Sequence, residues 1–490
     1  MNMEPPKFKC KYCRKFKTKD CSLGIDFVSG DDPADPRCFE LREIDNYVQF
    51  FSELILEQFT VKHFIKGGNS IGLYMWNDGS YVPCEEFLKA WVEYVAKQVG
   101  VDEKIKTHTV NEIVGKVERS TYCELNEEPM RIAFKNIVLD WKEFLEGNRE
   151  RAFLPLEETK ANPCFHKIPH RFDICLFDEI LNYEDFEKAC LEKVPEIVKI
   201  FKEWVGDNWR ILFEIIGYCL YPSYPFHKAF MLVGDGANGK STYLRLVKTI
   251  LGEENVVSVS LQDICNNRFS QALLYHKLAN IYADLPSKPL GYTGYFKILT
   301  GEDLISADRK FKDRITFRNY AKLLFSANEL PEVRDMTHAF WRRWIVIEFP
   351  NQFPEDPDFF ERTFTEEVIE KIITLSLVAF VEVWIKRKFS IEGESTDFKE
   401  KWLRKTNSVY AYIKEGVESG RIELDKEARV EPSTLYLDYQ TWCEENDRDP
   451  VSKQIFTMEL ERQFRITKKR VREGGRLTYA YVGIRLKDGE

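Results

Sequence analysis

Long hydrophobic runs, a secretory leader and internal repeats are all missing from the 490-residue sequence. The longest largely apolar run, residues 372–385, has 14 residues and contains Glu382, so it is too short and too polar to cross a bilayer. Residues 1–11 are polar and basic and lack the apolar core of a signal peptide. We therefore expect a cytoplasmic protein with no membrane partner, whose 12 cysteines remain thiols or bind metal.

A strong charge of one sign is missing as well. The net charge is −9, which excludes a uniformly basic nucleic-acid coat. Two segments are nevertheless locally basic: residues 1–20 contain seven Lys or Arg against two acids, and residues 453–476 contain eight against three. With 44% hydrophobic and 31% charged residues, the chain is typical of globular proteins, and its length suggests about three domains.

Four stretches of the sequence differ in character. Residues 1–40 are rich in Cys, Lys, Asp and Pro and contain few aliphatic residues. Residues 41–205 have mainly helical periodicity, interrupted by one hairpin signal at Asp78-Gly79. Residues 206–390 alternate short apolar strands with helices, which predicts an α/β domain with a parallel sheet. After a polar linker near residue 391, the remainder to residue 490 resembles a small α+β module.

The cysteines near the amino terminus have the spacing of a metal site. A segment with so few core-forming residues needs a cross-link such as a bound metal ion to fold. This favours a tetrahedral four-cysteine zinc site over four unrelated thiols. The predicted zinc ligands are Cys10, Cys13, Cys21 and Cys38. A second group of ligand types is Cys164, His166, His170 and Cys175, for which we favour packing over metal binding.

A phosphate-binding loop is the clearest motif in the chain. Residues 234–241 match G-x-x-x-x-G-K-S/T, between an apolar strand at 229–233 and a helix at 242–251. In this arrangement backbone N–H groups surround the β-phosphate, Lys240 reaches the β- and γ-phosphates, and Ser241 binds Mg²⁺. The predicted ATP-binding residues are Gly234, Asp235, Gly236, Ala237, Asn238, Gly239, Lys240, Ser241 and Thr242.

Polar residues also follow two further predicted strands. Asp284 follows the strand at 278–283, where it is suited to hold Mg²⁺ with Ser241 and to polarise the attacking water. Asn328 follows the strand at 322–327, where it could sense the γ-phosphate or simply form a turn. Beyond them, Arg342 and Arg343 precede another strand and are either surface charges or a finger for a neighbouring subunit's nucleotide.

Together these motifs resemble the superfamily 3 helicases, a compact branch of the AAA+ ATPases found in viruses, phages and plasmids. Residues 299–311 resemble the β-hairpin that projects into the channel of the ring in that group, with Lys310 and Phe311 at its DNA-binding tip. In papillomavirus members, the trans-acting arginine precedes a strand that ends Glu-Phe-Pro-Asn. Residues 348–351 have that sequence here, so the resemblance favours Arg343 over Arg342.

A closer resemblance, to phage, plasmid and poxvirus-type primase–helicases, covers most of the chain. Residues 74–83, 110–115 and 134–140 resemble the helical domain of that family, and residues 435–456 resemble its carboxyl-terminal winged helix. The winged-helix residues implied to contact DNA are Lys468, Lys469, Arg470 and Arg472, although a solvated basic face is the alternative. Ala283 departs from the family pattern, in which an acid often precedes the strand-end acid, so Asp284 acts alone.

The resemblance implies a multidomain protein with four parts: a zinc-binding segment (1–40), a mainly helical domain (41–205), an α/β AAA+ core (206–390) and a winged-helix domain (391–490). The expected activity is ATP-dependent DNA unwinding with Mg²⁺, by a homo-hexameric ring that moves 3′→5′ on single-stranded DNA. The implied source is a virus, a plasmid or a prokaryotic host, and a separate primase or polymerase is an implied partner. The alternatives are an ATP-switched initiator that contacts duplex DNA without processive unwinding, and a primase activity within residues 41–205.

Overall fold

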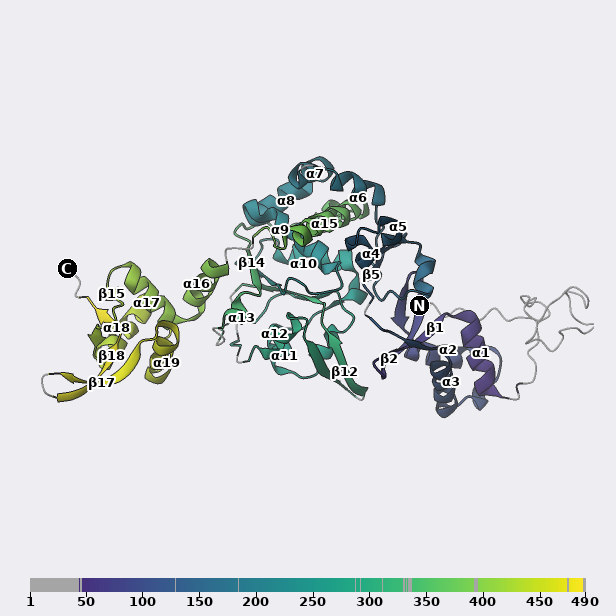
Figure 1. Cartoon of the computed structure of the whole chain (residues 1–490), viewed down its shortest axis with the longest axis horizontal. Helices are drawn as coiled ribbons and strands as arrows, with labels where there is room; N and C mark the ends of the chain where they lie inside the picture. Colours follow the sequence, from purple (N-terminus) through teal and green to yellow (C-terminus); the bar gives the residue numbers. More distant parts are fainter. Residues whose placement is uncertain are drawn as a thin grey trace, which may run out of the picture. The chain divides into compact units, whose positions relative to one another are not determined.

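A computed structural model describes residues 44–487, apart from gaps at residues 45, 128, 184, 287, 291, 311, 329–330, 332, 334–336, 392–394 and 474–475 (Figure 1). The chain forms two compact units that divide between Phe172 and Asp173. Within the described residues, no helix has both the length and the apolar character needed to cross a membrane. The four predicted zinc ligands lie outside the described part of the chain.

The first unit contains more sheet than the sequence periodicity predicts. Asp78 and Gly79 both have positive φ, 47° and 101°, and close the predicted hairpin between β2 and β3. β1 pairs with β2 and also with β4, which gives the order β3-β2-β1-β4. The elements are α1 (Tyr47–Gln58), β1 (Val61–Lys66), β2 (Asn69–Asn77), β3 (Ser80–Pro83), α2 (Glu85–Gln98), α3 (Thr107–Ser120) and β4 (Tyr122–Glu124).

A second small sheet completes this unit, with the order β5-β6-β7. Its strands are two or three residues long, too short for their alternation to be distinguished from loop sequence, so the periodicity of residues 41–205 did not predict this sheet. Its elements are β5 (Arg131–Ala133), β6 (Val138–Asp140), α4 (Trp141–Leu145), α5 (Arg149–Ala152) and β7 (Phe153–Leu154).

The second unit is built on a five-stranded parallel sheet with the order β14-β8-β13-β10-β9. The later strand β13 is inserted between β8 and β10, so the carboxyl ends of these three strands lie next to one another. Ligands of open parallel sheets bind at this edge. The strands are β8 (Ala229–Val233), β9 (Val256–Val257), β10 (Ala279–Tyr282), β13 (Lys322–Ala327) and β14 (Trp344–Glu348).

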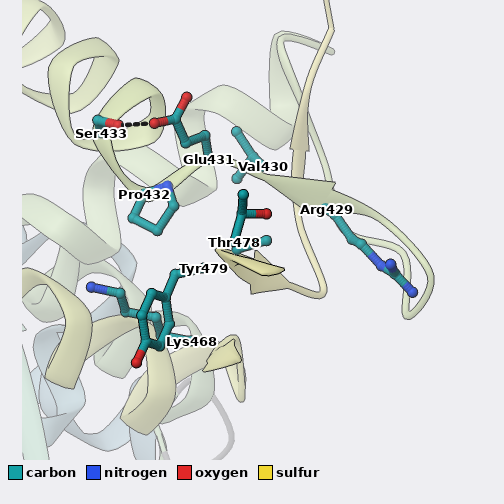
Figure 2. Close-up of a pocket in the computed structure, with 9 residues that line it drawn as sticks. Arg429, Val430, Glu431, Pro432, Ser433, Lys468, Thr478 and Tyr479 are labelled. Carbon is teal, nitrogen blue, oxygen red and sulfur yellow. Dashed lines mark hydrogen bonds between the residues drawn. The ribbon is translucent and has the colours of Figure 1, made fainter. Parts of the chain in front are cut away.

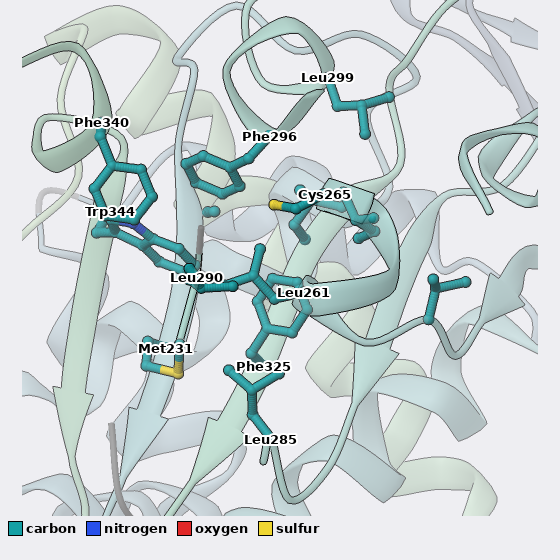
Figure 3. Packing of buried hydrophobic residues seen from close by; sticks show 14 of the residues in the cluster. Met231, Leu261, Cys265, Leu285, Leu290, Phe296, Leu299, Phe325, Phe340 and Trp344 are labelled. Atoms are coloured by element: carbon teal, nitrogen blue, oxygen red, sulfur yellow. The ribbon is translucent and has the colours of Figure 1, made fainter. Parts of the chain in front are cut away.

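Helices cover the sheet and bury its apolar side chains. Met231 and Phe325 point from the strands into a cluster that includes Cys265, Phe296 and Phe340 (Figure 3). This cluster is supplied by α11 (Leu261–Asn266), α12 (Gly294–Leu299) and α13 (His338–Trp341). Other helices of the unit are α6 (Ile174–Leu181), α7 (Phe186–Lys193), α8 (Pro195–Val205), α9 (Arg210–Cys219), α10 (Lys240–Leu251), α14 (Phe359–Thr363) and α15 (Glu366–Lys386). Because α6, α7 and α9 pack against α15, residues 174–219 belong to this unit and not to the segment before it.

The carboxyl-terminal part begins with α16 (Ser395–Thr406). Trp402 of α16 is fully buried in the cluster of Figure 3, and its indole N–H donates to the Pro331 carbonyl at 2.8 Å. Three helices and a three-stranded sheet of order β16-β18-β17 follow around a separate core. They are α17 (Ser408–Glu418), β16 (Arg429–Val430), α18 (Pro432–Glu445), α19 (Lys453–Phe464), β17 (Thr467–Glu473) and β18 (Arg476–Val482), with β15 (Ile422–Glu423) and β19 (Arg485–Leu486) paired beside them.

Candidate functional site

The loop between β8 and α10 has the backbone shape of an anion-binding loop. Gly236, Ala237 and Gly239 all have positive φ, at 100°, 48° and 88°. Positive φ is unfavourable for Ala237, and such strain is concentrated at functional sites. α10 starts at Lys240, directly after Gly239, so the unpaired N–H groups and the positive end of the helix face the loop. The local geometry therefore suits a phosphate.

Contacts from three other segments hold this loop in shape. Asn238 is 3% exposed and donates from Nδ2 to the Phe349 carbonyl at 3.2 Å, while the Phe353 amide donates to the Ala237 carbonyl at 2.7 Å. A Cβ on Gly239 would lie 2.6 Å from Nε1 of Trp204, a buried residue of α8. Only glycine fits this close approach, so the indole and the loop constrain each other.

Lys240 lies inside the loop with its ammonium group bound by oxygen acceptors. Its Nζ donates to the Gly234 carbonyl at 2.5 Å, to Asn238 Oδ1 at 3.0 Å and to Asn328 Oδ1 at 3.3 Å. Burial lowers the pKa of Lys240, and the carboxylate of Asp284 is among the charges that oppose this shift. All three bonded acceptors are neutral, so an anionic oxygen at this position would be a stronger partner for the lysine.

Asn328 and Asp284 follow strands on the same edge of the sheet as this loop. Asn328 follows β13, the direct neighbour of β8, whereas Asp284 follows β10, which is separated from β8 by β13. Asp284 has φ of 60°, and its amide donates to the Ser326 hydroxyl at 3.3 Å. Ser326, which lies in the interior of β13, was missed in the sequence because no local motif marks it. Asp284 and Ser241 are both exposed.

In the second cysteine–histidine group, Cys164, His166 and His170 are buried, whereas Cys175 is exposed on α6. Cys164 is fully buried, its thiol donates to the carbonyls of Arg131 and His166 at 3.3 Å each, and burial raises its pKa to about 11. A thiol held in this protonated state is a poor metal ligand. Across the described residues, no three His, Cys, Asp or Glu side chains are grouped so as to hold a metal ion.

The two adjacent arginines differ sharply in environment. Arg343 is 7% exposed, and its guanidinium donates to Thr300 Oγ1 at 2.9 Å, to the Lys297 carbonyl at 3.3 Å and to the Ala339 carbonyl. Arg343 therefore connects the end of α12 to α13 within its own chain. Arg342 is exposed. The sequence-based preference for Arg343 as a finger is thus not supported by the environment of its side chain.

The predicted hairpin consists of β11 (Leu304–Arg309) and β12 (Lys312–Arg318), paired antiparallel. Its base is anchored because alternate side chains, including Ile305 and Phe317, are buried in the core cluster. Asp308 forms ion pairs with Arg314 at 2.6 Å and Arg268 at 3.3 Å. Lys310 is exposed at the tip. Phe311, the predicted aromatic partner of Lys310, lies outside the described residues.

The predicted basic residues of the carboxyl-terminal module all lie on β17 and are exposed: Lys468, Lys469, Arg470 and Arg472. Sequence analysis missed Tyr479 of β18, which lies opposite Arg470 and accepts a hydrogen bond from its Nε at 2.8 Å. Lys468 and Tyr479 lie side by side in the lining of a groove, and Pro432 is another residue of that lining (Figure 2). The sequence pattern that indicates Tyr479 is an alternation of aromatic residues in the strand that pairs with a basic strand.

Comparisons with known proteins show similarities to a protein family, to viral proteins and to solved structures. Residues 232–343 match a family described as "Family of unknown function (DUF5906)". The chain is 30% identical over 149 residues to "Putative helicase L207/L206" of Acanthamoeba polyphaga mimivirus and 26% identical over 252 residues to "Putative helicase 121R" of Invertebrate iridescent virus 3. These matches include 29% and 47% of this chain but only 15% and 24% of the relatives. The apo A form of the NrS-1 C-terminal region aligns with 90% of this chain and 100% of its own, at 12% identity and a TM-score of 0.43.

Proposed function

We propose that the protein is an ATP-dependent DNA helicase of the superfamily 3 type. The observation that carries the proposal is the cluster of Lys240, its loop and Asn328 at the carboxyl ends of β8 and β13, with Asp284 following β10. The similarity to two viral proteins with helicase names supports the same activity. On this reading, residues 206–390 form the AAA+ motor, and the parallel sheet positions its ATP-binding residues.

Each residue of the cluster has a chemical role in ATP hydrolysis. Backbone N–H groups of the loop bind the β-phosphate, and Lys240 exchanges its neutral acceptors for the β- and γ-phosphate oxygens. The exposed oxygens of Ser241 and Asp284 are of the hard type that Mg²⁺ prefers, so the residues present fit this ion. Bound Mg²⁺ would neutralise charge that develops on the phosphates. Asn328 positions the attacking water, and Asp284 helps to polarise it.

The proposed assembly is a homo-hexameric ring in which ATP binds between subunits. Arg342 is exposed. Hydrogen bonds hold the backbone of the arginine pair: Lys228 Nζ donates to the Arg342 carbonyl at 2.8 Å, and the Ala229 amide donates to the Arg343 carbonyl at 2.7 Å. This support leaves the Arg342 side chain available to a neighbouring subunit's γ-phosphate. Arg343, in contrast, is engaged by its own chain, so we assign the finger to Arg342.

Replacement of Lys310 by alanine should separate ATP hydrolysis from strand movement. Lys310 is exposed at the hairpin tip and lies outside the proposed ATP-binding residues 234–242, so basal ATP turnover should stay within a few-fold of wild type. Stimulation of turnover by single-stranded DNA and unwinding of a tailed duplex should both be lost. Lys426, an exposed lysine of the carboxyl-terminal module, is a matched control whose alanine variant should behave as wild type. Unwinding that survives in Lys310→Ala would contradict the channel-hairpin assignment.

A strand-displacement assay tests the proposal as a whole. We expect the protein to release the labelled strand from a duplex with a 3′ single-stranded tail, in the presence of ATP and Mg²⁺, and not from one with a 5′ tail. DNA-stimulated ATP turnover without displacement of either substrate would instead support an ATP-switched initiator. The carboxyl-terminal module, with three helices followed by the β17–β18 ribbon, has the element order expected of the proposed winged helix.

The amino-terminal segment is proposed to hold zinc. Cys10, Cys13, Cys21 and Cys38 form one four-cysteine set, so we expect about one zinc ion per chain. Elemental analysis of a Cys10→Ser/Cys13→Ser variant should show loss of this zinc, whereas a Cys175→Ser variant, which alters an exposed thiol elsewhere, should retain it. Zinc that remains in the double variant would contradict the assignment.

A further inference from the structure

One face of the β17–β18 ribbon combines a row of cations with an exposed aromatic ring. In the antiparallel register, Arg470 lies opposite Tyr479 and Arg472 lies opposite Leu477, so these four side chains share a face. Lys468 lies two residues before Arg470 and therefore joins the same face. Successive cations along β17 are thus separated by about 6.8 Å, two strand residues. This spacing places a regular line of positive charge beside the ring.

The Tyr479 ring is held in place but remains accessible. It is 49% exposed, although its hydroxyl accepts a hydrogen bond from Arg470 Nε at 2.8 Å. The Arg470 guanidinium carbon lies 5.2 Å from the ring centroid and the Lys468 Nζ lies 5.5 Å from it. Next to Tyr479, Leu477 is 72% exposed. Two cations thus lie over a half-exposed ring, so an aromatic surface for a planar group and positive charge for its phosphate occur together.

A groove of about 490 Å³ continues from this ring toward α18. Figure 2 shows Lys468 beside Tyr479, with Pro432 and Ser433 at the start of α18 on the same side, and Arg429 on the opposite side with its side chain directed away from them. The acid in the lining, Glu431, is engaged in a hydrogen bond from the Ser433 hydroxyl. The lining therefore adds one further cation, Arg429, and one acid, Glu431, to the basic surface of the ribbon.

We propose that this face of the C-terminal module binds unpaired nucleotides of single-stranded DNA, with a base stacked on Tyr479 and phosphates on Lys468, Arg470 and Arg429. This inference rests on the proposed helicase function and names the form of DNA that the module recognises. Sequence-tolerant single-strand sites combine cations along the backbone with aromatic stacking platforms. In a duplex the faces of the bases are already stacked on one another, so an exposed aromatic ring contributes less binding energy to a duplex than to a single strand.

The helix beside the ribbon supports single strands over duplex DNA. α19 is the helix that would enter a major groove in a winged helix, yet its outward residues include Ile455, 43% exposed, and Met458, 54% exposed. Its exposed charges include both Glu461 and Arg462. Such a mixed surface is poorly suited to duplex phosphates, whereas β17 is uniformly basic from Lys468 to Arg470. The nucleic-acid contact of the module is therefore placed on the ribbon.

The test uses full-length Tyr479→Ala, Tyr479→Trp and Arg470→Ala, each in a Lys310→Ala background so that hairpin binding does not mask the effect. Affinity is measured for a labelled dT oligonucleotide and for a blunt duplex of equal length, over a range of salt. Tyr479→Ala should weaken oligonucleotide binding roughly 5- to 100-fold, since each stacked base contributes about 1–3 kcal/mol. Tyr479→Trp should preserve binding, and duplex affinity should not change.

Salt dependence separates stacking from charge. Tyr479→Ala should leave the log–log salt slope unchanged, while Arg470→Ala should reduce it by about 0.7 per lost phosphate contact. Three results would overturn the inference. In the first, Tyr479→Ala lowers the affinity for oligonucleotide and duplex equally; in the second, it does not lower the affinity for the oligonucleotide at all. In the third, the protein binds a poly-glutamate peptide as tightly as the oligonucleotide. These outcomes are distinct from failure of the helicase function, because ATP turnover and Lys310-dependent strand displacement are measured independently in the Tyr479→Ala single variant.

Discussion

Replacing Lys240 with alanine should abolish ATP turnover while the chain remains folded. The Nζ of Lys240 has three oxygen acceptors, Gly234, Asn238 and Asn328, and it is the proposed cation of the phosphate loop. Loss of one preorganised donor at developing charge lowers turnover by about 10²–10³-fold, and the loss should be at least this large for a charged donor. Steady-state phosphate release measures turnover, and thermal unfolding measures the fold.

Lys248 provides a matched control on the same helix. It lies on α10 eight residues after Lys240, is half exposed and forms an ion pair with Glu253 at 2.9 Å. Lys248→Ala removes the same charge from the same helix, and we expect turnover near the wild-type rate. A Lys240→Ala protein that hydrolyses ATP at the wild-type rate would remove the basis of the proposed function. One that is unfolded would show that Lys240 supports the fold instead.

Local sequence predicted the strands around the proposed phosphate loop well because each of these strands is encoded by a continuous segment. The predicted strand at 229–233 is β8, and the predicted strand at 322–327 is β13. Apolar runs bounded by polar residues suffice to locate such buried strands. The helix after the loop starts at Lys240 instead of residue 242, a shift of the size expected at helix ends.

The supports of the site could not be predicted because they come from distant segments. Trp204 restricts Gly239 from a helix 35 positions earlier, and the Phe349 carbonyl fixes Asn238 from beyond β14. Asp284 is separated from the loop by one strand because β13 lies between β8 and β10 in the sheet. No local sequence pattern indicates this strand order. Tyr479 was missed for the same reason, since its meaning depends on pairing with Arg470.

The pair Arg342 and Arg343 shows that burial distinguishes two residues that the spacing of the sequence does not. The two residues are adjacent and chemically identical, so the choice between them rested on a family pattern after the pair. In the structure, Arg343 is satisfied by Thr300, Lys297 and Ala339, and burial lowers its pKa, with the neighbouring charge of Arg342 contributing next. Adjacent residues at a helix end face different directions, so one faces the core and the other is exposed.

Arg342→Ala should keep the fold and ATP binding but lose turnover, by about 10³–10⁵-fold if the arginine acts across a subunit interface. Nucleotide affinity, measured with a fluorescent ATP analogue, should change little because the loop is intact. Arg343→Ala is the contrasting variant. It leaves the Thr300 hydroxyl and two carbonyls without their donor, which costs stability by about 1–3 kcal/mol for a buried unsatisfied group, so its melting temperature should fall.

Mixed rings show on which side of the interface Arg342 acts. Arg342→Ala subunits carry an intact Lys240 loop, and Lys240→Ala subunits carry an intact Arg342. When the two inactive proteins are combined, some interfaces should pair the two intact halves and recover turnover in proportion to their number. Recovery requires the arginine to act on its neighbour's nucleotide, because a residue acting within its own subunit would leave every site defective. If mixing recovers nothing, and Arg343→Ala is folded but inactive while Arg342→Ala is active, then Arg343 is the finger and its contacts with Thr300 must open on assembly.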